Sequence, residues 1–324
     1  MHRFRPLPVL VFFTLTALVA LAFALTVGSV PVTLPGVWNA LVGDGNDMAS
    51  TVVRELRWPR AMAAFAVGGL LAVAGALMQV LLRNPLADPY VLGLSGGAAC
   101  GALGAMLIGA AAFVTPAAFG GALLSSALVF GLARGDGVWS PTRLLLTGIV
   151  VAAGWGALIM LLLATAPEAQ VRGMLFWLIG DLSSSMHGGI ALVTLAVVLL
   201  LALPLARDAT LLARGEVTAA SLGVPVRPLT MALHALAAAA TAIAVTVAGS
   251  VGFVGLVVPH AVRILIGNDQ RWLLPASALA GGTLLVLADT LARTIIAPAQ
   301  LPVGVLTALA GVPIFLWLLR RGNS

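Results

Sequence analysis

The stretch VGFVGLVVPHAVRILIG, residues 251–267, decides how many times this chain crosses a membrane. It is apolar, but it is shorter than the roughly 20 residues that a helix needs to span about 30 Å of hydrocarbon. It also carries Pro259, His260 and Arg263. Because irregular backbone cannot face lipid, this segment can cross a bilayer only if other parts of the protein shield it.

Composition sets the class of protein. The 324 residues are 61% hydrophobic and only 9% charged, and their mean hydropathy is +1.11. A soluble domain of this length could not cover its surface with so few polar side chains. The chain is therefore predicted to be an all-α polytopic membrane protein, surrounded by the lipid bilayer.

The basic charge balance does not indicate a nucleic-acid partner. The net charge is +6, but the cations are all arginines, which stand singly or in pairs between apolar runs. This distribution is typical of topology signals rather than of a nucleic-acid-binding surface.

Apolar runs predict a single transmembrane domain, residues 1–324, with ten membrane-spanning helices. The first run could be a signal peptide, but its length and the spans that follow favour an uncleaved helix. The predicted spans lie near residues 7–27, 59–82, 91–111, 113–133, 141–164, 189–207, 229–249, 251–267, 272–292 and 302–320.

Arginine counting supports ten spans and fixes an expected orientation. With ten spans and a cytoplasmic N-terminus, twelve of the 17 arginines lie inside and five outside. If residues 251–267 did not cross, the split would fall to nine against eight. The positive-inside rule therefore favours ten spans, with both termini in the cytoplasm. The arginines left outside are Arg54, Arg57, Arg60, Arg172 and Arg293.

The outside arginines include a cluster, RELRWPR, at residues 54–60. Pro59 suits the first position of a helix, which places Arg60 in the first turn, where a cation opposes the helix dipole. The cluster could snorkel to lipid headgroups, or it could dock an acidic partner. Arg293 follows Asp289 by four residues, so these two could form a local ion pair.

Two turns on the cytoplasmic side carry unusual polar residues. In LLRNPLADPYVLG, residues 81–93, two prolines bar a continuous helix. Gln79, just before it, is a polar side chain inside an apolar span, and such residues face a partner helix or an aqueous pathway. A similar turn, RGDGVWSPTR, covers residues 134–143. Among the many small residues of the neighbouring spans, Gly97 and Gly101 form a GxxxG that allows close helix packing.

Two longer connections separate the later spans. Residues 166–188, outside, contain a short helix expected to lie at the membrane surface. His187 lies there, and a lone histidine is more often plain loop than a metal ligand. Residues 206–228, inside, mix charges with apolar residues at helical spacing, punctuated by Gly215 and Gly223 into two short helices. Such helices suit a groove in a soluble partner.

Several chemistries are missing from the sequence. It has no P-loop, no dinucleotide-binding glycine motif, no HExxH and no clustered catalytic triad. Cys100 is the only cysteine, which excludes internal disulfides and cysteine-ligated metals. Only Asp289 is placed within a span, whereas ion-coupled transporters usually keep a carboxylate near the midplane. We expect neither a catalyst nor a bound cofactor, and an ion-coupled secondary transporter remains the less favoured alternative.

The motifs resemble those of the permease subunits of ATP-binding-cassette importers for iron chelates and cobalamin. The resemblance covers essentially the whole chain and is carried by RWPR, GGLLAVAGALMQVLLRNPLADPYVLGLSGGA, ARGEVTAASLGVPV and GFVGLVVPHAVR, in that order. It implies the permease fold of type II importers, a homodimer, two ATPase subunits that bind ATP and magnesium, and a periplasmic binding protein. It also implies a multi-pass protein of the bacterial inner membrane.

The resemblance assigns roles to three groups of residues. Docking of the binding protein falls to Arg57, Arg60 and Arg293, with Arg54 left open. The cytoplasmic gate and pathway involve Gln79, Asn84, Leu86 and Thr142. Coupling to the ATPase involves Leu211, Arg214, Glu216, Ala219, Leu222 and Gly223. The implied substrate is an iron chelate, haem or a ferric siderophore, with cobalamin as the alternative, and no residue selects among them.

Overall fold

The computed structural model describes residues 4–28, 30–43, 47–134, 140–183, 188–297 and 299–322, and these fold into helices joined by short connections. Each of the ten predicted spans coincides with a helix. Within the described residues, seven helices are long and apolar enough to cross a membrane, and three are shorter apolar helices. The ten are α1 (Pro6–Thr26), α4 (Trp58–Leu81), α5 (Leu94–Leu107), α6 (Val114–Leu132), α7 (Pro141–Thr165), α9 (Gly188–Leu212), α11 (Val226–Ala248), α12 (Val254–Ile266), α13 (Gln270–Ala292) and α14 (Val303–Gly322).

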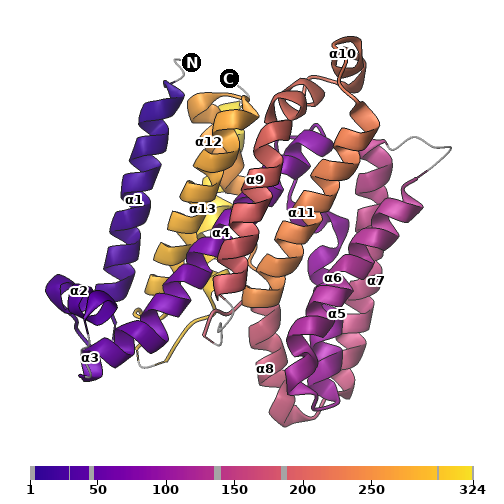
Figure 1. The fold of residues 1–324 in the computed structure, drawn as a ribbon. Helices are drawn as coiled ribbons and strands as arrows, with labels where there is room; N and C mark the ends of the chain where they lie inside the picture. Colours follow the sequence, from indigo (N-terminus) through magenta and orange to yellow (C-terminus); the bar gives the residue numbers. More distant parts are fainter. Residues whose placement is uncertain are drawn as a thin grey trace.

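Shorter elements mark the two ends of the bundle. Both chain ends lie at the same end, together with α10 (Glu216–Ser221), and we call this end the terminal face (Figure 1). The opposite face carries α2, α3 and α8 (Figure 1). The remaining short elements are α2 (Leu34–Val42), α3 (Met48–Thr51), the π-helix η1 (Val52–Arg57), the 3-10 helices η2 (Pro89–Leu92) and η3 (Ala111–Phe113), and α8 (Glu168–Ile179).

Helix α4 is the centre of the bundle. Every residue from 66 to 82 is buried, and α13, α11, α9 and α12 all pack against this helix. Small residues make this possible. A Cβ added at Gly68 would overlap the carbonyl of Gly281, and one at Gly75 would overlap the carbonyl of Gly255. The backbones therefore approach as closely as the glycines allow, which is how helices gain packing contacts in a membrane.

Glycine pairs also join α5 to α6. A Cβ at Gly97 would overlap the carbonyl of Gly121, and one at Gly101 would overlap the carbonyl of Ala117. The GxxxG spacing noted in the sequence thus lies in a close helix crossing, as expected.

The segment 251–267 is shielded by other parts of the protein, as its sequence requires of a short spanning segment. Helix α11 ends at Ala248, residues 249–253 are not helical, and α12 begins at Val254. The Tyr90 hydroxyl donates to the carbonyl of Val251 and accepts from its N–H, both at 3.1 Å. The Gln79 side chain donates to the carbonyl of Leu256 at 3.2 Å. Tyr90 of η2 therefore satisfies the irregular backbone and Gln79 of α4 satisfies the start of α12, so neither depends on lipid for a hydrogen bond.

The first apolar run is built into the bundle as α1. Its buried residues, Ala17, Ala20, Ala24 and Leu25, lie on one side, and α1 packs chiefly on α13. The Phe4 N–H donates to the carbonyl of Leu265 at 3.0 Å, which joins the start of the helix to the end of α12.

Candidate docking, gate and coupling sites

The predicted docking arginines gather at the opposite face, but their side chains turn inward. Arg57 is only 4% exposed. Its guanidinium donates to the carbonyls of Leu25 at 2.8 Å and Thr26 at 3.1 Å, and also to that of Val30. These carbonyls belong to the last turn of α1 and the chain just beyond it, where helical carbonyls have no partner of their own and the dipole is negative. Arg57 thus caps α1.

Two other arginines also donate to backbone carbonyls at helix ends. Arg293, at the end of α13, donates to the carbonyl of Ala24. Arg54 donates to the carbonyls of Ala40 and Gly43 at the end of α2. The arginine cluster therefore binds the ends of α1 and α2 to the start of α4.

Arg60 forms an ion pair between helices. Its Nε lies 3.1 and 3.0 Å from the two carboxylate oxygens of Asp289, and its Nη2 lies 2.8 Å from Oδ1. Its Nη1 donates to the side-chain oxygen of Gln300 at 2.8 Å, on the exposed side. The local pair of Asp289 with Arg293 that the sequence allowed is therefore not the one formed. Asp289 faces α4 and forms an ion pair with Arg60, whereas Arg293 donates a hydrogen bond to a backbone carbonyl of α1.

A more exposed cation of the opposite face lies on α8. Arg172 is exposed, and its guanidinium carbon lies 5.8 Å from the centre of the Phe176 ring. His187 lies outside the described residues, so the structure places no role on it.

Of the predicted gate residues, Asn84 and Thr142 are exposed at the terminal face, and Leu86 is half-buried. The Asn84 side chain accepts from the N–H of Leu86 at 2.9 Å, which shapes the turn after α4. Thr142 is exposed in the first turn of α7, where the Ser140 hydroxyl caps the helix by accepting from the N–H of Arg143 at 3.1 Å. Gln79 instead lies buried below the turn, and its N–H groups also reach the carbonyl of Ala87 at 3.4 Å.

An ion pair that the sequence did not indicate joins the gate turn to the coupling segment. Arg83, directly before Asn84, lies 3.1 Å from Glu216 at the start of α10. The two residues are 133 positions apart in the sequence, so no local pattern could have paired them. The pair therefore links α10 directly to the turn that follows α4.

The coupling segment differs from the sequence prediction in one respect. Helix α9 runs without a break to Leu212, so the segment 206–228 holds one separate short helix, α10, rather than two. Leu211 belongs to α9 and packs against the core. The predicted span 189–207 and the first predicted short helix are one continuous helix, because α9 continues beyond its apolar part through Arg207 and Asp208.

Helix α10 presents apolar side chains to solvent. Its end is fixed by Gly223, whose φ is +81°, and by hydrogen bonds from the N–H groups of Gly223 and Val224 to the carbonyls of Ala220 and Ala219, both at 3.0 Å. This is the Schellman pattern, in which a left-handed glycine ends a helix. Ala219 is fully buried, whereas Leu222 is 61% and Val217 is 85% exposed.

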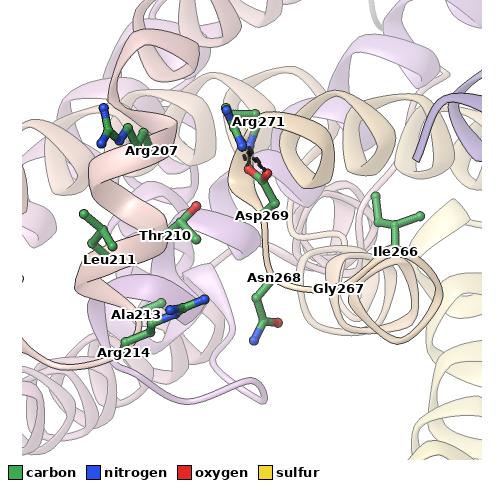
Figure 2. A pocket seen from close by; sticks show the side chains of 10 residues that line it. All are labelled: Arg207, Thr210, Leu211, Ala213, Arg214, Ile266, Gly267, Asn268, Asp269 and Arg271. Atoms are coloured by element: carbon green, nitrogen blue, oxygen red, sulfur yellow. Dashed lines mark hydrogen bonds and ion pairs between the residues drawn. The ribbon is translucent and has the colours of Figure 1, made fainter. Parts of the chain in front are cut away.

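Two hollows open near the helix ends. The hollow at the terminal face has a volume of about 480 Å³. Figure 2 shows its lining side chains, which come from the end of α9 and from the loop between α12 and α13. Hydrogen bonds from Arg271 hold the pKa of Asp269 below its usual value. The other hollow, of about 410 Å³, lies among the ends of α5, α6, α8 and α11, and its lining includes Phe176, Trp177, Thr246 and Asp181.

This arrangement defines a class of protein: a multi-pass transport permease with a short helix and exposed apolar side chains at one face. Residues 15–321 match the model of the FecCD transport family, and the chain belongs to that family. It is the permease subunit of an ATP-binding-cassette importer rather than the ATPase, and this implies an ATPase and a binding protein as partners.

Several relatives are similar over most of their length. The hemin transport system permease protein HmuU of Yersinia pestis is 42% identical over 95% of this chain and 94% of its own. The Fe(3+) dicitrate transport system permease protein FecD of Escherichia coli is 39% identical over 96% of this chain and 98% of its own. The cobalamin import system permease protein BtuC of Halobacterium salinarum is 42% identical over 85% of this chain and 74% of its own.

A solved structure has the same fold. An inward-facing conformation of a metal-chelate type ABC transporter matches with a TM-score of 0.87 and 29% identity, over 97% of this chain and 99% of that one. The relatives include archaeal proteins such as that of Halobacterium salinarum. The family therefore occurs in archaea as well, and membership of it does not establish the predicted bacterial membrane.

Proposed function

We propose that this chain is the permease of an importer that moves an iron chelate, haem or a ferric siderophore, by alternating access driven by ATP hydrolysis. In this proposal two copies form a homodimer and bind two ATPase subunits and one binding protein. The terminal face lies in the cytoplasm, and the opposite face meets the binding protein.

The observation that carries the proposal is the combination of exposed and anchored residues in α10. Val217 and Leu222 are exposed apolar side chains, so they suit a groove in the ATPase. Ala219 is buried beneath them, and Glu216 is paired with Arg83 of the gate turn. A rigid α10 moved by the ATPase would therefore displace the turn that carries Asn84 and Leu86.

The ion pairing supports ATP rather than an ion gradient as the source of energy. An ion-coupled transporter needs a carboxylate in its spans that can release and bind cations. Asp289 is the acidic residue within the described spans that the sequence singled out, and Arg60 holds both of its oxygens. It is not available to carry a coupling ion.

The docking role of the arginines follows from charge and position together. Arg57, Arg60 and Arg293 gather around Asp289 and outnumber it, while Glu55 is exposed in the same segment, so this cluster would attract an acidic partner at short range. Arg60 is the member suited to direct contact, because its Nη1 reaches Gln300 at the exposed side. A glutamate of the binding protein would replace Gln300 there and would bind more strongly, since a charged acceptor strengthens the hydrogen bond.

The choice of substrate rests on the relatives and on the opposite-face hollow. Relatives are named for hemin, ferric dicitrate and cobalamin. Phe176 and Trp177 line a hollow that has few charges, which suits a bulky, rigid and partly apolar ligand. An iron chelate is the first candidate, and cobalamin is the second.

Transport by the reconstituted complex tests the proposal. The chain, its ATPase and its binding protein would be placed in proteoliposomes, and uptake of radiolabelled haem, a ferric siderophore and cobalamin would be compared with and without ATP. We expect ATP-dependent uptake of an iron chelate. Uptake of cobalamin alone would favour the second candidate. Uptake driven by a proton or sodium gradient without the ATPase would contradict the proposal.

A further inference from the structure

The hollow at the terminal face carries unbalanced positive charge. Asp269 and Arg271 neutralise each other through an ion pair of 2.7 Å. Arg207 and Arg214 also line the hollow. Of the ion pairs formed among the described residues, none involves these two arginines. In Figure 2 the Arg214 side chain extends from the turn just after α9 toward the loop that carries Asn268.

The acidic residues nearby do not cancel this charge. Glu216 lies two positions beyond Arg214, but its carboxylate is paired with Arg83. Asp208 follows Arg207 on α9, is half-buried, and is not among the residues that line the hollow. The hollow therefore has two arginines in its lining, and Figure 2 shows that Arg214 is the one whose guanidinium is directed toward the opposite wall.

The two arginines stand at the end of an apolar stripe on α9. Exposed residues recur along this helix at intervals of three and four, which places them on one side. The stripe is apolar from the opposite face to Pro204 and becomes basic only at the terminal face. Its members are Ile190, Val193, Val197, Leu200, Pro204, Arg207, Leu211 and Arg214, of which Leu211 is half-buried.

We propose that this hollow binds the headgroup phosphate of an anionic phospholipid from the leaflet at the terminal face. The apolar part of the stripe matches the acyl chains, and the arginines then lie at the depth of the headgroups. Guanidinium groups bind phosphate through paired hydrogen bonds, and Asn268 adds a polar side chain on the far wall. Basic pockets between membrane helices are suited to such lipids.

The hollow overlaps the predicted coupling segment, because Leu211 and Arg214 line the hollow and are also predicted coupling residues. A bound lipid would brace the end of α9 where α10 begins. The proposal does not depend on which substrate is transported, since it concerns the lipid-facing side of α9.

Lipid selectivity measured in nanodiscs provides the test. The full chain would be placed in phosphatidylcholine nanodiscs that contain a trace of spin-labelled phosphatidylglycerol or spin-labelled phosphatidylcholine, and the motionally restricted fraction of each label would be compared. We expect the wild type to restrict phosphatidylglycerol more strongly. The double variant Arg207→Gln with Arg214→Gln should remove this preference. Each lost guanidinium should lower the relative affinity for phosphatidylglycerol by about fivefold, the effect of one basic side chain near an anionic membrane surface.

Matched variants separate the site from general charge effects. Arg143→Gln removes one exposed arginine from another helix, α7, at the same face and should leave the preference unchanged. Arg207→Lys with Arg214→Lys keeps both charges and should keep most of the preference. Thermal unfolding in detergent identifies any variant that fails to fold, and the lysine variants keep the test valid if the glutamine variants fail.

Three results would overturn the proposal. The glutamine variants could fold normally and keep the full preference, which would place lipid binding elsewhere. Inorganic phosphate could displace the label from the wild type at millimolar concentration, which would make this a site for soluble anions. The preference could also vanish when the ATPase binds, which would assign the hollow to an acidic side chain of that partner.

Discussion

Arg60 and Asp289 form an ion pair that joins the start of α4 to the end of α13, with a shortest distance of 2.8 Å. The side chain of Arg60 is 14% exposed and that of Asp289 is 4% exposed. The pair uses both carboxylate oxygens. Removing one partner from a pair with so little access to water leaves the other charge without compensation.

Asp289→Asn is therefore expected to destabilise the protein by about 3–5 kcal/mol, the usual cost of breaking a buried pair on one side. Arg60→Gln combined with Asp289→Asn should recover part of this loss, because no charge is then left unpaired. Unfolding in detergent with a chemical denaturant measures both. Asp269→Asn is the matched control, since its pair with Arg271 is exposed and should contribute far less. Equal losses for the two single variants would contradict this account.

Adjacent glycines of α6 test the packing of α5 on α6. A Cβ at Gly121 would overlap the carbonyl of Gly97, whereas a Cβ at Gly120 would meet nothing within 4 Å. Gly121→Ala should cost about 1–3 kcal/mol through overpacking, and Gly120→Ala should change stability by less than about 0.5 kcal/mol. Thermal unfolding of both variants in the same detergent gives the comparison. A loss of stability in Gly120→Ala as large as in Gly121→Ala would show that the close approach is not the cause.

Much of the fold could be predicted because its signals are local. Length and apolarity predict the ten helices, and the arginine distribution favours a crossing by the segment 251–267. The short helix α2 was missed although a signal was present. Thr33 caps it by accepting from the N–H of Gly36 at 3.3 Å, and Pro35 stands in its first turn. A threonine followed by proline is a helix-start pattern.

The partners of the polar residues could not be predicted, because they come from distant parts of the chain. Asp289 had an arginine four residues away, yet it pairs with Arg60, which is 229 positions away. Ser126 on α6 and His234 on α11 also form a buried hydrogen bond of 3.0 Å, with the Phe130 ring stacked on the histidine. Single sequences reveal periodicity within an element, but they do not reveal which faces of different helices meet.

The pair of Arg83 with Glu216 should matter more for coupling than for stability. Both side chains are partly exposed, at 32% and 38%, so Glu216→Gln should cost less than about 1 kcal/mol of stability. In the reconstituted complex it should lower uptake for each ATP hydrolysed by about fivefold or more, the lower range of coupling between sites. The reversed pair, Arg83→Glu with Glu216→Arg, should restore part of the coupling. Normal coupling in both single variants would remove this link from the mechanism.

The exposed apolar residues of α10 should bind the ATPase. Leu222→Ser is expected to weaken assembly by about tenfold or more, since removing a central apolar side chain from an interface usually costs over 1 kcal/mol. Ser221→Ala, also exposed and on the same helix, should have little effect. Co-purification at a series of ATPase concentrations measures the affinity. Unchanged assembly with Leu222→Ser would show that α10 does not carry the interface.

Docking of the binding protein tests the arginines of the opposite face, and their burial decides which variant is informative. Reversing the charge of Arg57 would uncap α1, so lost docking could simply reflect a distorted fold. The more informative change is Gln300→Glu, which places a competing carboxylate beside the Nη1 of Arg60 and leaves every arginine in place. We expect it to weaken docking severalfold, and we expect added salt to weaken docking in the wild type, because long-range attraction is screened.

Arg172→Gln, on α8, is the control for a change of charge on the same face. Surface plasmon resonance with the immobilised binding protein measures each affinity. If Gln300→Glu binds as tightly as the wild type at low salt, Arg60 does not contact the partner.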